Sequence, residues 1–457
     1  MTFLFAAYRP TCESSVTIRH MTGHQYHRPG GDTGGRSADR APAGAPAARR
    51  APCRTATPRP SRLRRAARAL LIALTGAATL TGCADRDLFL GGAPPAPEEA
   101  IRILPGDGAR GVRANGRLEV RVPEGRLERV EVNRAGGSGR QPVAGRISRD
   151  GTIWRPVTDS LELASRYTVD AVAVDGAGRR TTRHTTFNTF APPHRLIGFY
   201  SPESGATVGT GLIFSLVFNR PVLDRAAVER AVTVSARPAV EVAPHWFGHR
   251  RLDFRPRERW RPGTRLTVQL RLREVRTGPG AYGIQHKTLH YQVGRDQVST
   301  VDAARHTLTV RRDGKVVATL PVTAGNAENP TYNGTMVILE RHAVTRMDGD
   351  TVGFGAEYDI PDVPHAMRLT RSGTFLHGNY WARREVFGGL NTSHGCVGLR
   401  DVRGGGPDTP AGWLYRNSIV GDTVEVRNSP DRTVAPDNGL GGWNMPWAAW
   451  RAGSALH

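Results

Sequence analysis

The residue types best suited to catalysis gather between residues 375 and 400. Cys396 lies in the run Ser393–Arg400, where glycine and histidine precede it, and a second histidine, His377, lies 19 positions upstream. A thiol is a weak nucleophile until its proton is removed, and an imidazole is the usual base for that step. The spacing therefore predicts that Cys396 is a nucleophile and His377 its general base.

Cysteine is nearly absent elsewhere in the chain. The other three, Cys12, Cys53 and Cys83, lie before or at the expected start of the mature protein. A single thiol in the remaining body indicates chemistry rather than a disulfide framework. The alternative is a buried, inert cysteine, since cysteine is among the most buried residue types.

The two motifs together resemble the catalytic domain of L,D-transpeptidases, the YkuD family, over about residues 296–427. The family signature is a histidine, a spacer and then Ser/Thr-His-Gly-Cys, and here 15 residues separate His377 from Ser393. The segment Pro330–Thr335 resembles the family's strand entry, Thr-Pro-x-Gly. Two upstream regions resemble the immunoglobulin-like modules of actinobacterial members.

The resemblance implies a reaction. Cys396 would attack the carbonyl between the diamino acid at position three of a tetrapeptide stem and its terminal D-alanine, leaving a thioester. The side-chain amine of a neighbouring stem would resolve it and form a 3→3 cross-link in peptidoglycan, whereas water would make the same site a carboxypeptidase. Acylation by carbapenem-type β-lactams is a further implication. No metal or organic cofactor is expected, because the histidines and the cysteine lack the four-ligand spacing of a zinc site.

The resemblance also assigns supporting roles around the nucleophile. The backbone carbonyl of Gly378 would orient His377 in place of a carboxylate, and His394 would position substrate or steady the thiolate. An exchange of roles between the two histidines stays open. The N–H groups of Gly395 and Cys396 are the expected oxyanion donors, and Gly395 lets the backbone approach the substrate closely.

Three more residues are candidates for the active site, and each also has an ordinary structural interpretation. Tyr358 matches a tyrosine of the family's lid and would add its hydroxyl to the oxyanion site, although an ordinary packed tyrosine fits equally. Ser393 either hydrogen-bonds within the motif or forms a turn. Arg400 either meets a substrate carboxylate or is a solvated surface arginine.

The chain departs from the family's pattern in two places. Many members have Asn or Arg two positions after the cysteine, where this chain has Gly398. Pro361 and Pro364, between Tyr358 and His377, suggest a lid of altered shape. Neither change touches the proposed nucleophile or base.

The elements expected to position these residues are mainly β-strands. Leu118–Val122 and Arg166–Val174 alternate apolar and polar residues, which is typical of half-buried strands. Trp154-Arg155-Pro156 recurs 100 residues later as Phe254-Arg255-Pro256. The repeat predicts two tandem antiparallel sandwiches, acting as spacers and packing partners or binding the wall directly.

The catalytic region is expected to be β-rich with one short helix. Thr307–Val310 and Val316–Leu320 flank Asp313-Gly314, the signature of a tight hairpin, and Thr409–Tyr415 is the helical segment. Further strands are expected at 336–339, 367–370 and 423–426. In the tail, Trp443, Trp447 and Trp450 have helical spacing, which indicates a face docked on the catalytic domain rather than a substrate platform.

The segment 62–83 has the features of an export signal. A basic head precedes about 12 apolar residues, too few to span a bilayer, and Leu-Thr-Gly-Cys83 resembles the lipobox of bacterial lipoproteins. Cys83 would then be acylated and anchor the protein to the outer face of the membrane. An ordinary secretory peptide or an uncleaved anchor is the alternative.

The net charge of +22 does not indicate nucleic-acid binding. Residues 1–82 hold 13 arginines and only 3 acidic residues, and the remaining positive charge is spread thinly along the rest of the chain. Mild attraction to anionic cell-surface polymers is compatible with it. Residues 1–60 lack an apolar period, so we expect disorder or a downstream start.

The predicted fold class is mainly β. The predicted organisation is a disordered or mis-assigned start (1–60), a lipoprotein signal peptide (61–82), a Pro/Gly-rich tether (83–99), immunoglobulin-like domains (100–191 and 192–295), an L,D-transpeptidase domain (296–428) and a Trp-rich extension (429–457). The expected partners are peptidoglycan stem peptides and, through Cys83, the membrane. Two rivals are a papain-like protease, in which histidine should follow the cysteine, and a non-catalytic wall-binding lipoprotein.

Overall fold

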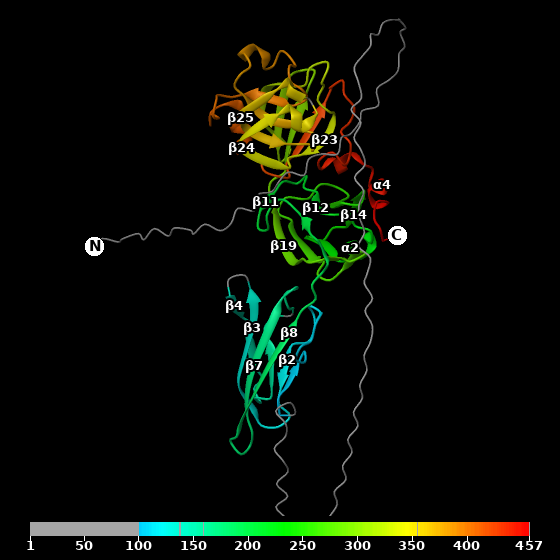
Figure 1. The fold of residues 1–457 in the computed structure, drawn as a ribbon. Coiled ribbons are helices and arrows are strands. Elements are labelled where there is room, and N and C mark those ends of the chain that lie inside the picture. Colours follow the sequence, from blue (N-terminus) through cyan, green and yellow to red (C-terminus); the bar gives the residue numbers. More distant parts are fainter. Residues whose placement is uncertain (1–99, 137–138, 159, 354, 457) are drawn as a thin grey trace, which may run out of the picture. The chain divides into compact units, whose positions relative to one another are not determined.

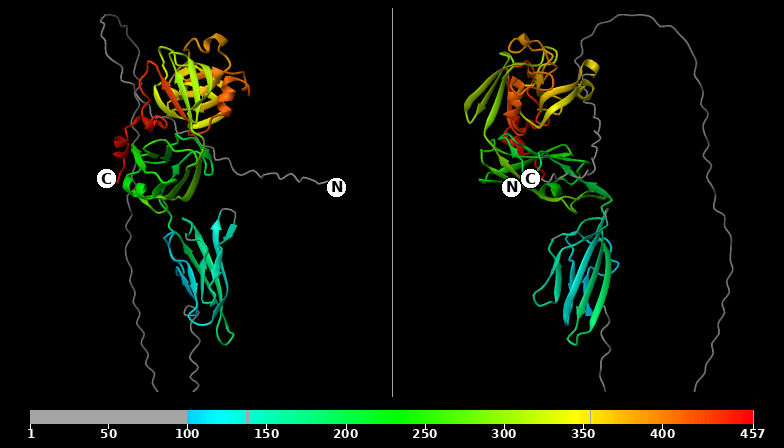
Figure 2. Two further views of the ribbon diagram at one scale, coloured as in Figure 1. Left: turned by 180° about the vertical axis from the view of Figure 1, so that it is seen from behind. Right: turned by 90° about the vertical axis from the view of Figure 1, so that its left-hand side faces the viewer.

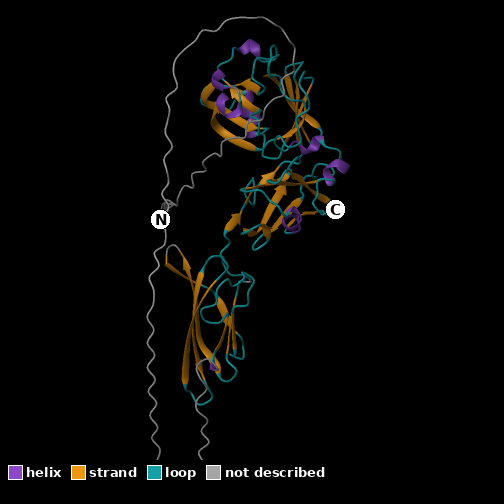
Figure 3. Cartoon of the chain, turned by 45° about the vertical axis from the view of Figure 1, so that its right-hand side comes forward, coloured by secondary structure: helices purple, strands orange, loops and turns teal. Residues whose placement is uncertain are grey.

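The computed structural model describes residues 100–456 apart from 137, 138, 159 and 354. The predicted segments 1–60, 61–82 and 83–99, with Cys83, lie outside the described residues. Strands dominate the described chain, with only short helices (Figure 3), which confirms the predicted fold class. Among these residues, no helix combines the length and apolar character needed to cross a membrane.

The first module is a two-sheet sandwich, drawn in cyan in Figure 2. Along β7 the side chains of Tyr167, Val169, Ala171 and Ala173 are buried in alternation, and Tyr167 stacks on Phe187 at 5.1 Å. One sheet has the order β1-β2-β6-β5 and the other β4-β3-β7-β8. The strands are β1 Arg102–Leu104, β2 Glu119–Arg121, β3 Arg126–Gly136, β4 Gly139–Pro142, β5 Gly145–Ile147, β6 Ile153–Pro156, β7 Arg166–Val174 and β8 Arg180–Asn188.

The second module repeats this plan with sheets β10-β12-β15-β14 and β11-β19-β16-β13 and a small sheet β17-β18-β9. The repeat is confirmed, because Trp154 and Phe254 are both buried strand residues, in β6 and β15. Its elements are β9 His194–Leu196, β10 Gly198–Phe199, β11 Thr207–Val208, β12 Phe214–Phe218, α2 Arg225–Arg230, β13 Val232–Arg237, β14 Val242–Phe247, β15 Arg251–Pro256, β16 Arg265–Arg271, β17 Arg276–Gly278, β18 Ala281–Gly283 and β19 His286–Val293.

The third module is a nine-stranded sheet in the order β23-β28-β20-β21-β22-β27-β26-β25-β24 (Figure 1). The predicted hairpin is confirmed, with Asp313 and Gly314 at positive φ between β21 and β22. The pairs β20–β28 and β26–β27 are parallel. The strands are β20 Gln297–Asp302, β21 Thr307–Arg312, β22 Lys315–Thr323, β23 Gly334–Val337, β24 Glu340–Asp348, β25 Asp359–Arg368, β26 Phe375–Asn379, β27 Val397–Arg400 and β28 Thr423–Arg427.

The predicted helix is present as α3, Pro410–Arg416. The hydroxyl of Thr409 accepts a hydrogen bond from Gly412 N, and Pro410 occupies the first turn, where its missing N–H costs nothing. Short 3-10 turns are present as η1 Gly349–Val352, η2 Gly355–Glu357 and η3 Arg384–Val386. Apolar side chains from α3 and the strands form one core, including Leu376, Val397 and Leu414.

The tail forms η4 Gly441–Asn444 and α4 Trp447–Arg451, separated at Pro446. Its tryptophans join a hydrophobic cluster that includes Val337 of the catalytic region and Ala243 of the second sandwich. The predicted docking on the catalytic domain is therefore incomplete, because the second sandwich forms part of the same contact. Trp450 Nε1 donates to Ala243 O at 2.9 Å and Trp443 Nε1 to Gly211 O at 2.7 Å, both in the second sandwich. The Arg255 guanidinium lies over all three indole rings, at 4.6 to 5.3 Å. The exact domain boundaries stay predictions.

Candidate active site

Parallel pairing of β26 with β27 brings the two halves of the motif together. In this register His377 lies opposite Gly398, and Cys396 directly precedes β27. Strand side chains alternate between faces, so residues two apart share a face. The register therefore points Cys396 toward the face that carries His377.

His377 is held by the backbone next to it. The residue is 5% exposed, and its Nδ1 lies 3.0 Å from the carbonyl oxygen of Gly378. A carbonyl only accepts, so this hydrogen bond assigns the proton to Nδ1 and leaves Nε2 as the basic nitrogen. The indole of Trp381 stacks on the imidazole at 5.7 Å with a 12° angle between the rings.

The base and the thiol are both neutral at rest. Burial lowers the pKa of His377, and the hydrogen bond to Gly378 and the charge of Asp401 partly oppose that effect. Burial raises the pKa of the Cys396 thiol to about 11, against a backbone hydrogen bond from Phe375. The thiol donates to the carbonyl of Gly373 at 3.4 Å. A thiol in this state requires a base before it can attack.

The turn before the nucleophile is tied by Ser393. Its hydroxyl donates to the carbonyl of Cys396 at 2.5 Å and accepts from Gly395 N at 3.2 Å. Gly395 has φ of +108°, which side chains rarely allow. Ser393 thus forms hydrogen bonds within the motif, which is one of the two alternatives predicted for it. The Gly395 N–H is engaged in this turn, which corrects its expected availability as an oxyanion donor.

Tyr358 and His394 meet at the same site. Their ring centroids are 5.2 Å apart, and His394 Nε2 lies 3.1 Å from Glu357 Oε2. Burial, and next the charge of Cys396, raise the pKa of Tyr358 to about 12. Its hydroxyl therefore keeps its proton and can donate.

The two departures from the family's pattern have a structural explanation. A Cβ on Gly398 would lie 2.9 Å from Thr323 Cγ2, so the neighbouring strand leaves no room for a side chain. Pro361 and Pro364 lie within β25 rather than in a loop, and the turns η1 and η2 precede Tyr358. The expectation that these prolines alter the shape of a lid stays a prediction.

Arg400 is exposed at the end of β27, opposite Asn379. Sequence reasoning missed two residues close to the base, Asp401 and His365, whose carboxylate and imidazole are 2.7 Å apart. Their separation in sequence gives no pattern that could have linked them. In the part of the chain that the structure describes, no three His, Cys, Asp or Glu side chains are grouped as a metal site requires.

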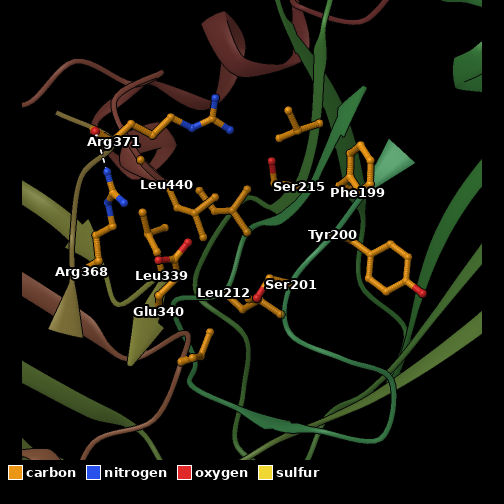
Figure 4. A pocket seen from close by; sticks show the side chains of 14 residues that line it. Phe199, Tyr200, Ser201, Leu212, Ser215, Leu339, Glu340, Arg368, Arg371 and Leu440 are labelled. Atoms are coloured by element: carbon orange, nitrogen blue, oxygen red, sulfur yellow. Dashed lines mark hydrogen bonds between the residues drawn. The ribbon is translucent and has the colours of Figure 1, made fainter. Parts of the chain in front are cut away.

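A cavity of about 340 Å³ is separate from this site. It is lined by apolar residues such as Leu212, Leu339 and Leu440 and by two arginines, Arg368 and Arg371 (Figure 4). Arg368 donates to the carbonyl of Arg371 at 2.9 Å. None of the predicted catalytic residues lines it.

Comparison with known proteins defines the class first. Residues 109–276 match the bacterial Ig domain and residues 296–426 match the L,D-transpeptidase catalytic domain, YkuD. The chain is 35% identical to L,D-transpeptidase 2 of Mycobacterium tuberculosis (strain CDC 1551 / Oshkosh) over 76% of this chain and 83% of the relative. It is 31% identical to L,D-transpeptidase 5 of Mycobacterium tuberculosis (strain ATCC 25618 / H37Rv) over 82% of each.

Among solved structures, LdtMt1 in complex with imipenem is 29% identical, with a TM-score of 0.42, over 51% of this chain and all of that one. On the sequence relatives, the chain belongs to the L,D-transpeptidase family. It is an enzyme of that class, built from immunoglobulin-like modules and a YkuD catalytic domain.

Proposed function

We propose that this enzyme forms 3→3 cross-links in peptidoglycan through a thioester on Cys396. His377 Nε2 takes the thiol proton as sulfur attacks the carbonyl between the diamino acid and D-alanine. The C–N bond then breaks, the proton passes to the leaving amine, and D-alanine departs. The side-chain amine of a second stem attacks the thioester, gives up its proton, and Cys396 is released as the thiol.

One observation carries the proposal: the Nδ1–H of His377 is hydrogen-bonded to Gly378 O, in the strand that pairs with β27, which Cys396 directly precedes. This fixes the tautomer in which Nε2 is the free base. Because burial raises the pKa of the thiol and lowers that of the imidazole, we infer proton transfer during attack rather than a preformed ion pair.

The remaining site residues take roles consistent with their contacts. The N–H of Cys396 and the hydroxyl of Tyr358 would stabilise the oxyanion. His394, paired with Glu357, would position substrate, and Arg400 would meet a stem carboxylate. We further propose that carbapenem-type β-lactams acylate Cys396 and that acylated Cys83 anchors the enzyme outside the membrane.

Product analysis tests the proposal. The purified exported domain is incubated with disaccharide-tetrapeptide, and products are identified by mass spectrometry beside Cys396→Ala. Dimers with loss of D-alanine support cross-linking, and monomers shortened by one residue identify a carboxypeptidase. No change, in wild type and variant alike, identifies a wall-binding protein.

Thiol labelling assigns the base. We expect His377→Ala to slow acylation of Cys396 near neutral pH more than His394→Ala does. The reverse order would exchange the roles of the two histidines.

A further inference from the structure

Asp401 is a fully buried carboxylate next to the site. Its side chain is 0% exposed. Oδ1 accepts from three donors, at 2.8 Å from Val402 N and at 2.9 Å from both Gly406 N and Thr409 Oγ1. Oδ2 lies 2.7 Å from His365 Nδ1. A buried carboxylate is tolerated only when its oxygens are satisfied in this way.

The carboxylate of Asp401 packs closely against Gly378, the residue whose carbonyl orients His377. A Cβ built on Gly378 would lie 2.2 Å from Asp401 Oδ2, which is closer than any side chain could tolerate. Gly378 also provides the carbonyl that binds His377 Nδ1. Asp401 therefore touches the one peptide segment whose position fixes the imidazole.

His365, in β25, holds the carboxylate of Asp401 through its Nδ1. It lies in β25 with φ of +50°, a backbone conformation uncommon outside glycine that histidine adopts more readily than most residues. Its ring contacts Tyr415 of α3 at 5.0 Å, and a Cβ on Gly405 would lie 2.8 Å from it. The imidazole is thus enclosed on the sides away from Asp401.

We propose that Asp401, braced by His365, is a positioning residue for His377: it holds the Gly378 carbonyl in place and stabilises the imidazolium formed when the thiol proton is taken. This deepens the proposed function and rests on it. Asp401 thereby takes the place of the carboxylate in a catalytic triad, but it acts through the Gly378 peptide and does not contact the His377 ring directly. The charge of Asp401 also raises the pKa of His377 against the effect of burial.

The charged and titratable groups that face Asp401 and His365 come from four elements. His365 faces Asp401 from β25, and Tyr415 faces His365 from α3. The guanidinium of Arg341, from β24, lies 4.2 Å from the Tyr415 ring. His377 faces the carboxylate through Gly378 from β26.

The principal test is the pH profile of acylation by a carbapenem, followed by intact mass, in the full exported chain. Asp401→Asn keeps the shape and removes the charge. We expect its acid-side midpoint to fall by about one pH unit, with acylation near neutral pH slowed roughly tenfold. Asp422→Asn is the matched control, since Asp422 is equally buried but bound to Arg295, and its profile should stay that of wild type. An unchanged profile in Asp401→Asn overturns the proposal.

A second test separates positioning from folding. Gly378→Ala should impair acylation severely because the new Cβ meets Oδ2, and the same change in an Asp401→Ala background should cost much less. His365→Asn retains a donor near Nδ1 and tolerates positive φ, so it should resemble wild type, whereas His365→Ala should not. Additive effects in the first cycle, or equal behaviour of the two His365 variants, contradict the proposal.

Nuclear magnetic resonance of the His377 imidazole nitrogens keeps this inference distinct from the proposed function. Loss of the protonated Nδ1 signature in Asp401→Asn supports positioning even if wild type fails to react with a carbapenem. Failure of wild type to react would count against the nucleophile instead. A wild-type signature in Asp401→Asn overturns the positioning role.

Discussion

The hydroxyl of Ser393 spans the turn before the nucleophile and ends 2.5 Å from the carbonyl oxygen of Cys396. The Ser393 hydroxyl oxygen also accepts a hydrogen bond from Gly395 N. One small side chain therefore fixes the peptide before Gly395 and the peptide after Cys396. The geometry of the nucleophile thus depends on a residue that performs no chemistry itself.

Removing that hydroxyl should weaken catalysis more than the fold. Ser393→Ala loses two hydrogen bonds, for which we expect a loss of about 1–3 kcal/mol in the free energy of unfolding and acylation of Cys396 slowed about tenfold. Chemical denaturation and β-lactam acylation rates measure the two effects. Ser148→Ala, which removes similar bonds to Asp150 and Ile153 in the first sandwich, should leave acylation unchanged. Equal acylation rates in both variants would refute the role of the turn.

The raised pKa of the thiol predicts a specific pH dependence of stability. In the unfolded chain Cys396 ionises near its ordinary value of 9.0, whereas in the folded chain it ionises near 11. The unfolded state therefore releases its proton first, and the thiol makes the fold less stable as pH rises through that window. The difference in melting temperature between wild type and Cys396→Ala should change in favour of the variant from pH 9 to pH 11. A difference independent of pH would contradict this.

Thr323 leaves no space for a side chain at position 398. Gly398→Ala brings a Cβ to 2.9 Å from Thr323 Cγ2, so we expect a loss of about 1–3 kcal/mol in the free energy of unfolding. Thr323→Ser removes that methyl and keeps the hydroxyl that accepts from Thr392 N. The double variant should regain most of the loss in urea titrations. No recovery would show that Thr323 is not the cause.

Trp450 of the tail should contribute far more to stability than Trp381 of the catalytic module. Trp450 is 0% exposed, contacts Arg255 and bonds to Ala243. Trp450→Ala should cost about 3–5 kcal/mol and free the tail for limited proteolysis. Trp381→Ala, at a side chain 44% exposed, should cost less than about 1 kcal/mol. Similar losses in the two variants would argue against a packed tail.

Local patterns predicted much of the fold and site. Alternation along β7, the Asp313-Gly314 turn and the Thr409 helix start are local signals, and the structure has all three. The proximity of the Cys396 and His377 segments followed from the paired motif. Each prediction used residues close together in sequence or a spacing that the chain itself displays.

What sequence could not supply depends on contacts between distant segments. The prediction for the tail missed the second sandwich, because the spacing of three tryptophans indicates an apolar face but not which modules contact it. Asp401 and His365 gave no signal, since 35 residues lie between them and only the curl of β25 and the loop after β27 brings them together. The hydrogen bond from Gly395 N to the Ser393 hydroxyl likewise depends on a turn geometry that the sequence does not specify.

The most direct test of the account is the mass of the enzyme during turnover. The exported domain is mixed with a tetrapeptide stem donor, quenched in acid and examined by intact mass and peptide mapping, with Cys396→Ala in parallel. We predict an adduct equal to the donor minus D-alanine, located on Cys396 and discharged into a dimer when an acceptor stem is added. An adduct on another residue, or cross-linked product from the alanine variant, would contradict the account.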